Sequence, residues 1–228
     1  MAKLDHSVSQ KGGRMNRVFS AVAALAFLVT PAAGQVQRPT VIRPSGVYVQ
    51  APTGMRYPES VGDFQRADIV RYKEDGTDES AGYNRVVPLK EIVATVYVFP
   101  SPRLRSFGSP RYVIEDARNR LCADQFHAIK NEVTSAHPDA VLLREGTTSL
   151  EQGNVKHQGH MAAYRLTNPR FSGRSNVALH SDVYVFCYAG GKWTVEYRID
   201  YPIEYDASAE IADFMRDLVW TIPPEPEN

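Results

Sequence analysis

One stretch decides the fold: HSDVYVFCYAGGKWTVEYRIDYP, residues 180–202. Two runs of β-branched and aromatic residues flank Gly190 and Gly191, and such runs are typical of strands. Paired glycines favour a tight two-residue turn, because glycine adopts positive φ without strain. The stretch therefore predicts an antiparallel hairpin with three facing pairs: Tyr184–Tyr197, Phe186–Val195 and Tyr188–Trp193.

The two faces of this hairpin differ, because successive side chains of a strand point to opposite faces. One face carries Tyr184, Phe186, Tyr188, Trp193, Val195, Tyr197, Ile199 and Tyr201. We interpret this face as core packed against a helix; Tyr184, Trp193 and Tyr197 are also candidates for an aromatic binding surface. The opposite face is expected to be partly covered, with an ion pair between Glu196 and Arg198, and it carries Val183, Val185, Cys187, Thr194, Glu196, Arg198 and Asp200.

Two amphipathic helices are predicted. The first covers 110–136, with Ser109 as N-cap and Pro110 in the first helical position. Its expected apolar stripe is Ile114, Ala117, Leu121, Ala128, Ile129 and Val133. The second covers 208–220, is capped by Asp206 or Ser208, and has the stripe Ile211, Phe214, Met215, Leu218 and Val219.

The remaining strands follow from β-rich runs at 47–50, 67–72, 82–87, 91–99, 139–150 and 155–166. The acidic segment 74–80 contains Asp75-Gly76, which favours a hairpin turn; it lacks the alternating acidic spacing of a calcium-binding loop. These elements predict an α+β fold, a mainly antiparallel sheet of about six to eight strands with the two helices packed on it. We expect an extended leader at 35–46, a single domain at 47–222 and a loose tail at 223–228.

Residues 1–34 have the pattern of an export signal. Arg14 and Arg17 precede a short apolar run, and Ala32 and Gly34 supply the small residues of a cleavage site. Met15 begins a compact signal by itself, so residues 1–14 are either part of the signal or a start-site extension. We expect cleavage near Gly34, a periplasmic or secreted location, and no membrane span in the mature chain.

Charge argues against a nucleic-acid partner. The chain has 26 basic and 26 acidic residues, and removing residues 1–34 takes away four basic residues and one acidic residue. The mature chain is therefore slightly acidic, whereas a protein that neutralises phosphates is basic on one face.

Two pairs of residues are candidates for specific chemistry. Cys122 and Cys187 are the only cysteines, and an exported chain can form a disulfide between them or keep both as thiols. His157 and His160 have the one metal-like spacing, although no third ligand is apparent nearby and they are also explained as surface histidines. No nucleophile elbow, zinc-protease motif, phosphate-binding loop or Cys-x-x-Cys is present, so no catalytic residue, metal or cofactor is assigned.

The order of elements resembles the PsbP/Mog1-like group. The resemblance rests on a strand ending Tyr97-Val98-Phe99-Pro100, the long helix after it, the late segment 192–198 and the closing helix. It implies an α/β/α sandwich and a non-catalytic assembly or adaptor role, and no site residue carries over. The expected function is thus an exported, non-catalytic binding or assembly module for an envelope protein or a small ligand. The alternative is an envelope hydrolase with scattered catalytic residues.

Overall fold

The computed structural model describes residues 38–104 and 108–224. These residues belong to one compact unit. The expected export signal at 1–34, the first part of the leader and the end of the tail lie outside the described residues.

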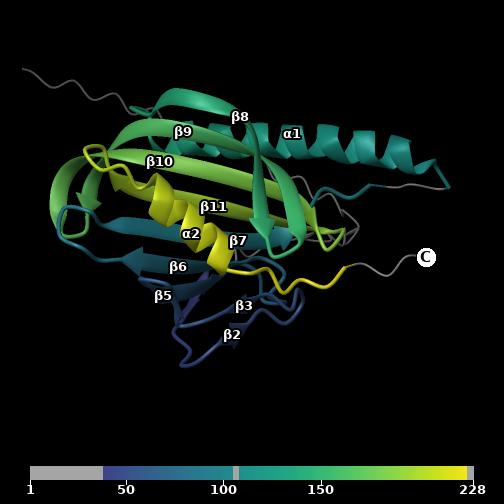
Figure 1. The fold of residues 1–228 in the computed structure, drawn as a ribbon, viewed down its shortest axis with the longest axis horizontal. Helices are drawn as coiled ribbons and strands as arrows, with labels where there is room; N and C mark the ends of the chain where they lie inside the picture. Colours follow the sequence, from purple (N-terminus) through teal and green to yellow (C-terminus); the bar gives the residue numbers. More distant parts are fainter. Residues whose placement is uncertain (1–37, 105–107, 225–228) are drawn as a thin grey trace, which may run out of the picture. The chain divides into compact units, whose positions relative to one another are not determined.

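The centre of the fold is a nine-stranded sheet in the order β1-β5-β6-β7-β11-β10-β9-β8, with β4 paired beside β5 (Figure 1). Every neighbouring pair is antiparallel, so the predicted mainly antiparallel sheet is confirmed. Its strands are β1 (Thr40–Ile42), β4 (Ser60–Val61), β5 (Phe64–Arg71), β6 (Glu79–Arg85), β7 (Ile92–Pro100), β8 (Val141–Gln152), β9 (Val155–Phe171), β10 (Arg174–Ala189) and β11 (Trp193–Pro202). A separate two-stranded sheet pairs β2 (Tyr48–Val49) with β3 (Arg56–Tyr57).

Part of the expected leader belongs to the sheet. Val41 of β1 pairs with Val70 of β5, which places β1 at one edge. Pro39 and Pro44 flank this strand. Proline lacks a backbone donor and is therefore compatible with an edge strand but not with a central one.

The register of the β10–β11 hairpin is confirmed at two of the three predicted pairs. Tyr184 faces Tyr197 and Phe186 faces Val195. The third pair is wrong, because Trp193 faces Ala189 and the register shifts between Phe186 and Ala189.

The cause of the shift is Tyr188, which has a φ of 59°. Its backbone N–H donates to Ser101 Oγ at 2.9 Å, and its hydroxyl donates to the Pro102 carbonyl at 3.1 Å. Contacts with the segment that follows β7 therefore hold Tyr188 in a bulge, and short-range turn chemistry did not reveal them.

Helix α2 (Ser208–Asp217) packs on the aromatic face of the hairpin, as predicted. Phe214 is its central residue and contacts Phe64 and Tyr83, with ring centroids 4.4 and 5.4 Å away. Asp206 Oδ1 accepts a hydrogen bond from the Ser208 backbone N–H at 3.1 Å, and Ala207 occupies the N-cap position. Val219, expected in the apolar stripe, is 54% exposed, because the helix ends before it.

Helix α1 (Arg111–Ala136) packs on the other face of the hairpin, against Val183 and Val185. Its buried residues are Cys122, Phe126, Ile129 and Val133. The predicted stripe is therefore partly wrong: Ala128 is exposed, and Ile114, Ala117 and Leu121 are only half-buried. The N-terminal part of α1 extends past the strands in Figure 1, so the sheet buries little of it.

The start of α1 also differs from the prediction. Pro110 occupies the N-cap position and no side chain caps the helix, so Ser109 does not have the expected role. The hairpin face beneath α1 is covered more fully than expected, since Val183 and Val185 are fully buried and Glu196 is 2% exposed.

The segment after α2 is tied to the sheet. Gln152 Nε2 donates to the Met215 and Leu218 carbonyls, both at 2.8 Å, and so satisfies acceptors at the end of α2. Trp220 Nε1 then donates to the Tyr197 hydroxyl at 2.7 Å. Among the described residues, neither helix has the length and apolar character needed to cross a bilayer.

Candidate functional site

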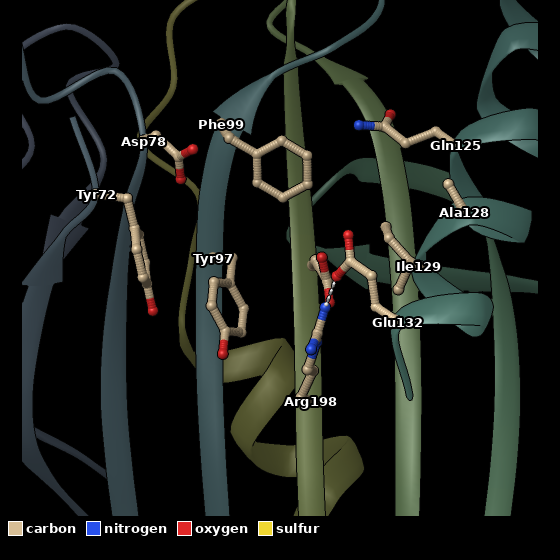
Figure 2. A pocket seen from close by; sticks show the side chains of 10 residues that line it. Tyr72, Asp78, Tyr97, Phe99, Gln125, Ala128, Ile129, Glu132 and Arg198 are labelled. Atoms are coloured by element: carbon tan, nitrogen blue, oxygen red, sulfur yellow. Dashed lines mark hydrogen bonds and ion pairs between the residues drawn. The ribbon is translucent and has the colours of Figure 1, made fainter. Parts of the chain in front are cut away.

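A groove runs between helix α1 and the part of the sheet that this helix leaves uncovered (Figure 2). Its volume is about 550 Å³. We call it the α1 groove, and it is lined by Tyr72, Asp78, Tyr97, Phe99, Gln125, Ala128, Ile129, Glu132, Glu196 and Arg198.

The groove lies beside α1, which packs mainly on β9 and β10 and reaches β7 at Phe99. Strand β7 alternates Tyr97 and Phe99 onto the same face of the sheet, and the neighbouring strand β11 adds Glu196 directly opposite Tyr97. Tyr72 and Asp78 come from the two ends of the β5–β6 turn. Four separate segments of the chain therefore form the floor and walls.

Arg198 lies at the centre of the floor. Its Nε donates to Glu196 Oε1, and its Nη2 donates to Glu132 Oε2 on α1 at 2.8 Å. The expected pair between Glu196 and Arg198 is present. The guanidinium of Arg198 also lies over the Tyr97 ring, 5.2 Å from the ring centroid. Arg198 thus joins the sheet to the helix.

Burial is the largest cause of the pKa shifts of the groove carboxyls Asp78 and Glu196. Removal from water raises the pKa of Glu196, and the Arg198 guanidinium opposes this rise. Burial also acts to lower the pKa of Arg198, but the Glu196 and Glu132 carboxylates outweigh it, and this pKa is raised. Burial raises the pKa of Asp78, with Lys73 opposing and Asp75 adding to the rise.

The aromatic side chains form a row across the floor. The rings of Tyr72 and Tyr97 stack with centroids 6.2 Å apart and an interplanar angle of 26°. The Tyr72 hydroxyl lies 3.3 Å from Ser80 Oγ. In Figure 2 the Phe99 ring lies between Asp78, on the side of the β5–β6 turn, and Gln125 on α1. The groove thus offers flat apolar surfaces beside ionised groups.

A hydrogen-bonded chain includes Gln125, one of the residues that line the groove. Thr194 Oγ1 lies 2.8 Å from Ser101 Oγ and donates to Gln125 Oε1 at 3.0 Å. Ser101 Oγ in turn accepts the Tyr188 backbone N–H. The Thr194 hydroxyl thus bonds to α1, and the Ser101 hydroxyl bonds to the bulge at Tyr188.

The three aromatic candidates from the sequence do not lie in this groove. Tyr197 is fully buried and Trp193 is 7% exposed, and both belong to the core beneath α2. Tyr184 is half-buried and lines a different hollow, beside Asp182 and α2. Trp193 and Tyr197 therefore lie in packed core, as the first interpretation of this face has it, whereas Tyr184 lies at the margin of that core.

The two candidate metal ligands point to opposite faces of β9. His157 contacts Trp220 in a tilted arrangement, with ring centroids 4.1 Å apart, and His160 stacks on Phe126 at 5.2 Å. Residues three apart share a face on a helix but not on a strand. The spacing consequently does not bring the imidazoles together, and no group of three or more His, Cys, Asp or Glu side chains in the described ranges could hold a metal ion.

The structure joins Cys122 of α1 to Cys187 of β10 in a disulfide, with the Cα atoms 5.8 Å apart. It lies next to the groove, because Gln125 follows on the next turn of α1. The bond fixes the part of α1 that forms the groove wall.

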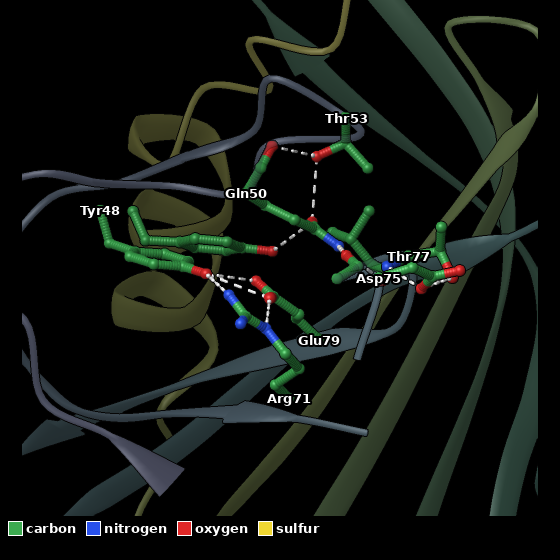
Figure 3. Close-up of polar contacts among 10 residues, drawn as sticks. Tyr48, Gln50, Thr53, Arg71, Asp75, Thr77 and Glu79 are labelled. Atoms are coloured by element: carbon green, nitrogen blue, oxygen red, sulfur yellow. Dashed lines mark hydrogen bonds and ion pairs between the residues drawn. The ribbon is translucent and has the colours of Figure 1, made fainter. Parts of the chain in front are cut away.

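A second polar cluster lies beneath strand β2 (Figure 3). Glu79 is 1% exposed and accepts hydrogen bonds from the Tyr48 hydroxyl at 2.9 Å and from Arg71 Nε at 2.6 Å. Gln50 Nε2 donates to the Gly76 carbonyl at 2.9 Å. Each of these polar side chains has a hydrogen-bond partner within the cluster. The bonds anchor β2 to the β5–β6 turn.

The tip of that turn has its own local bonds. Asp75 Oδ1 accepts the backbone N–H of Thr77 at 2.9 Å and its hydroxyl at 2.6 Å. These bonds lower the pKa of Asp75. The acidic segment thus uses Asp75 to shape the turn.

Sequence reasoning missed most of the groove residues. Glu196 and Arg198 were expected to pair, but Tyr97, Phe99 and Asp78 were assigned only to a strand and a turn. The sequence did contain one signal for the groove. Glu196 and Arg198 are charged residues of a central strand, and such residues need polar partners on the face that they share.

No protein-family model matches the chain, and no curated protein matches it.

Proposed function

We propose that the protein is an exported, non-catalytic binding or assembly module and that the α1 groove is its binding site. The observation that carries the proposal is the groove itself: a volume of about 550 Å³ with Tyr97 and Phe99 on its floor and Arg198 held in place by two carboxylates. Preformed concave sites with aromatic surfaces and a few fixed polar groups are typical of ligand sites. The partner is an envelope protein or a small ligand.

Export is the second part of the proposal. Its support is the basic, apolar and small-residue pattern of residues 1–34. N-terminal sequencing of the protein from the periplasm or the medium should begin at Gln35. A chain that keeps Met1 or Met15 and stays in the cytoplasm would contradict it.

We also propose that the fold is a PsbP/Mog1-like α/β/α sandwich. Its support is the order of elements and the packing of β10, where Val185 contacts the cluster beneath α1 and the next residue, Phe186, contacts the cluster beneath α2. An experimental structure with both helices on one face of the sheet would refute this.

The alternative, an envelope hydrolase, needs a nucleophile bonded to a base. Next to the groove, within the described part of the chain, the hydroxyls of Ser101 and Thr194 bond to each other, and that of Thr194 donates to Gln125. This arrangement favours the binding module over the hydrolase.

Photo-crosslinking in the cell tests the binding site. A benzoylphenylalanine placed at Ala128 lies in the groove, and the same group at Ala123 lies on the exposed surface of the same helix. We expect a discrete adduct from position 128 and none from position 123. Equal labelling at both positions, or no adduct at 128, would refute the groove as the binding site.

A further inference from the structure

The formal charge of the α1 groove is negative. Its lining includes three carboxylates, from Asp78, Glu132 and Glu196, and one guanidinium, from Arg198. A ligand that enters must therefore balance an excess of negative charge in a partly water-excluded space.

Arg198 is largely committed to carboxylates of the protein itself. Its Nε and Nη2 already donate to Glu196 and Glu132, and its guanidinium lies over the Tyr97 ring. An anionic ligand at Arg198 would approach the Glu196 and Glu132 carboxylates that this side chain already binds. The arrangement disfavours carboxylate or phosphate ligands.

Asp78, by contrast, has no basic partner within 4 Å among the described residues. Burial raises its pKa, and the charge of Lys73 opposes this rise only in part. Lys73 and Asp75 are the other charged groups that influence it. An incoming cation would supply the missing partner.

The neighbouring Phe99 is half-buried and packs against the apolar cluster beneath α1, but it also lines the groove. In the described part of the chain, cations lie over Tyr97, Phe126, Tyr188 and Tyr205 but not over Phe99. Figure 2 shows this ring beside Asp78, facing the opening between the turn and α1. An aromatic face beside a carboxylate is a favourable environment for an ammonium or guanidinium group.

On these grounds we infer that the α1 groove binds a lysine or arginine side chain of an extended basic peptide segment. The inference rests on the proposed function and names its ligand class. The apolar stem of such a side chain packs on Ile129, and its charged end lies at Asp78 beside the Phe99 ring.

Fluorescence anisotropy with labelled peptides tests the ligand class on the purified, exported protein. The probes are three hexapeptide amides that alternate glycine with lysine, norleucine or glutamate. We expect the lysine peptide to bind, the norleucine peptide to bind at least tenfold more weakly, and the glutamate peptide not to bind. Binding of the lysine peptide should weaken as salt is raised.

Two variants locate the contact. Asp78→Asn and Phe99→Leu should each weaken binding of the lysine peptide about three- to tenfold, because one removes the charge and the other removes the π face. The matched control is Asp63→Asn, which makes the same change of charge beside α2, far from the lining of the groove. It should leave the affinity unchanged.

The outcomes separate the two proposals. Equal binding of the norleucine and lysine peptides would overturn the cation inference and leave the groove as an apolar binding site. Binding of the lysine peptide that is unaffected by both groove variants would overturn it as well. Failure of all three peptides refutes the ligand class, while an adduct at position 128 and none at 123 would still support the proposed function.

Discussion

Cys122, in the middle of α1, is bonded to Cys187 of β10, and their Cα atoms are 5.8 Å apart. The bond closes a loop over a sequence separation of 65 residues. In the chain-entropy model such a loop stabilises the folded state by about 4 kcal/mol. We therefore expect the double variant Cys122→Ser/Cys187→Ser to lose about this much free energy of unfolding in urea titrations. Intact-mass measurement after alkylation of the unreduced wild-type protein should show no free thiol, and two labelled thiols would contradict the bond.

A second prediction concerns Gly159 of β9. A Cβ at this position would lie 2.5 Å from the Val185 carbonyl oxygen and 2.6 Å from Phe186 Cδ1. Because backbone cannot easily move aside, Gly159→Ala should destabilise the protein by about 1–3 kcal/mol. Gly146→Ala is the matched control in the adjacent strand β8, where an added Cβ meets nothing within 4 Å. It should be neutral or slightly stabilising, and equal losses in the two variants would refute the packing argument.

The third prediction concerns Gln152, which binds the end of α2. Gln152→Ala leaves the Met215 and Leu218 carbonyls without this donor and removes the acceptor of the Trp220 N–H. We expect a loss of about 1–3 kcal/mol, because these groups are largely buried. The adjacent Glu151→Ala, which removes only a long, exposed pair with Lys156, should change stability by less than about 0.5 kcal/mol.

The fourth prediction is a pH dependence at Asp182. Burial raises the pKa of this carboxyl, although the hydroxyls of Tyr201 and Tyr184 and the charges of Arg144 and His180 oppose the rise. The folded state therefore holds the proton more tightly than the unfolded state. The contribution of Asp182 to the free energy of unfolding is fully present when the pH is below the ordinary carboxyl pKa. It is lost as the pH rises through the pKa that Asp182 has in the folded state.

Asp182→Asn mimics the protonated group, so its stability relative to wild type should increase between pH 4 and pH 7. Asp139 provides the opposite case, because a hydrogen bond from the Thr167 backbone N–H lowers its pKa. Asp139→Asn should therefore change little in stability relative to wild type between pH 4 and pH 7, because the stability from a carboxyl with a lowered pKa is already present above the ordinary carboxyl pKa. Urea titrations at the two pH values measure both trends, and parallel behaviour of the two variants would contradict the assignment.

Local sequence patterns correctly predicted the two strands of the β10–β11 hairpin and the face that belongs to the core. The alternation around Phe186 and Tyr197 fixed both the strands and the core face, and these residues are buried as expected. The same patterns failed at Tyr188, where contacts from Ser101 and Pro102 hold a bulge. Nothing within the hairpin sequence specifies those distant partners.

The candidate site was harder to predict because it is defined by what α1 leaves uncovered. The helical pattern placed Ala128 in the buried stripe, whereas it lies on the exposed wall of the groove. The burial of Cys122 and Phe126 instead depends on how the helix rotates over β9 and β10. Charged residues on a central strand, such as Glu196, were the one local sign that polar partners must lie above the sheet.

The pairing of Val98 on β7 with Val195 on β11 has a consequence for the order of folding. Strands β1, β5, β6 and β7 lie on one side of this junction, and β11, β10, β9 and β8 lie on the other. A chain that emerges N-terminus first, from a ribosome or a translocation channel, can assemble its first strands well before β11 appears. During that interval β7 has an open edge, and such edges invite pairing with other chains. This edge is covered only when β11 pairs with β7.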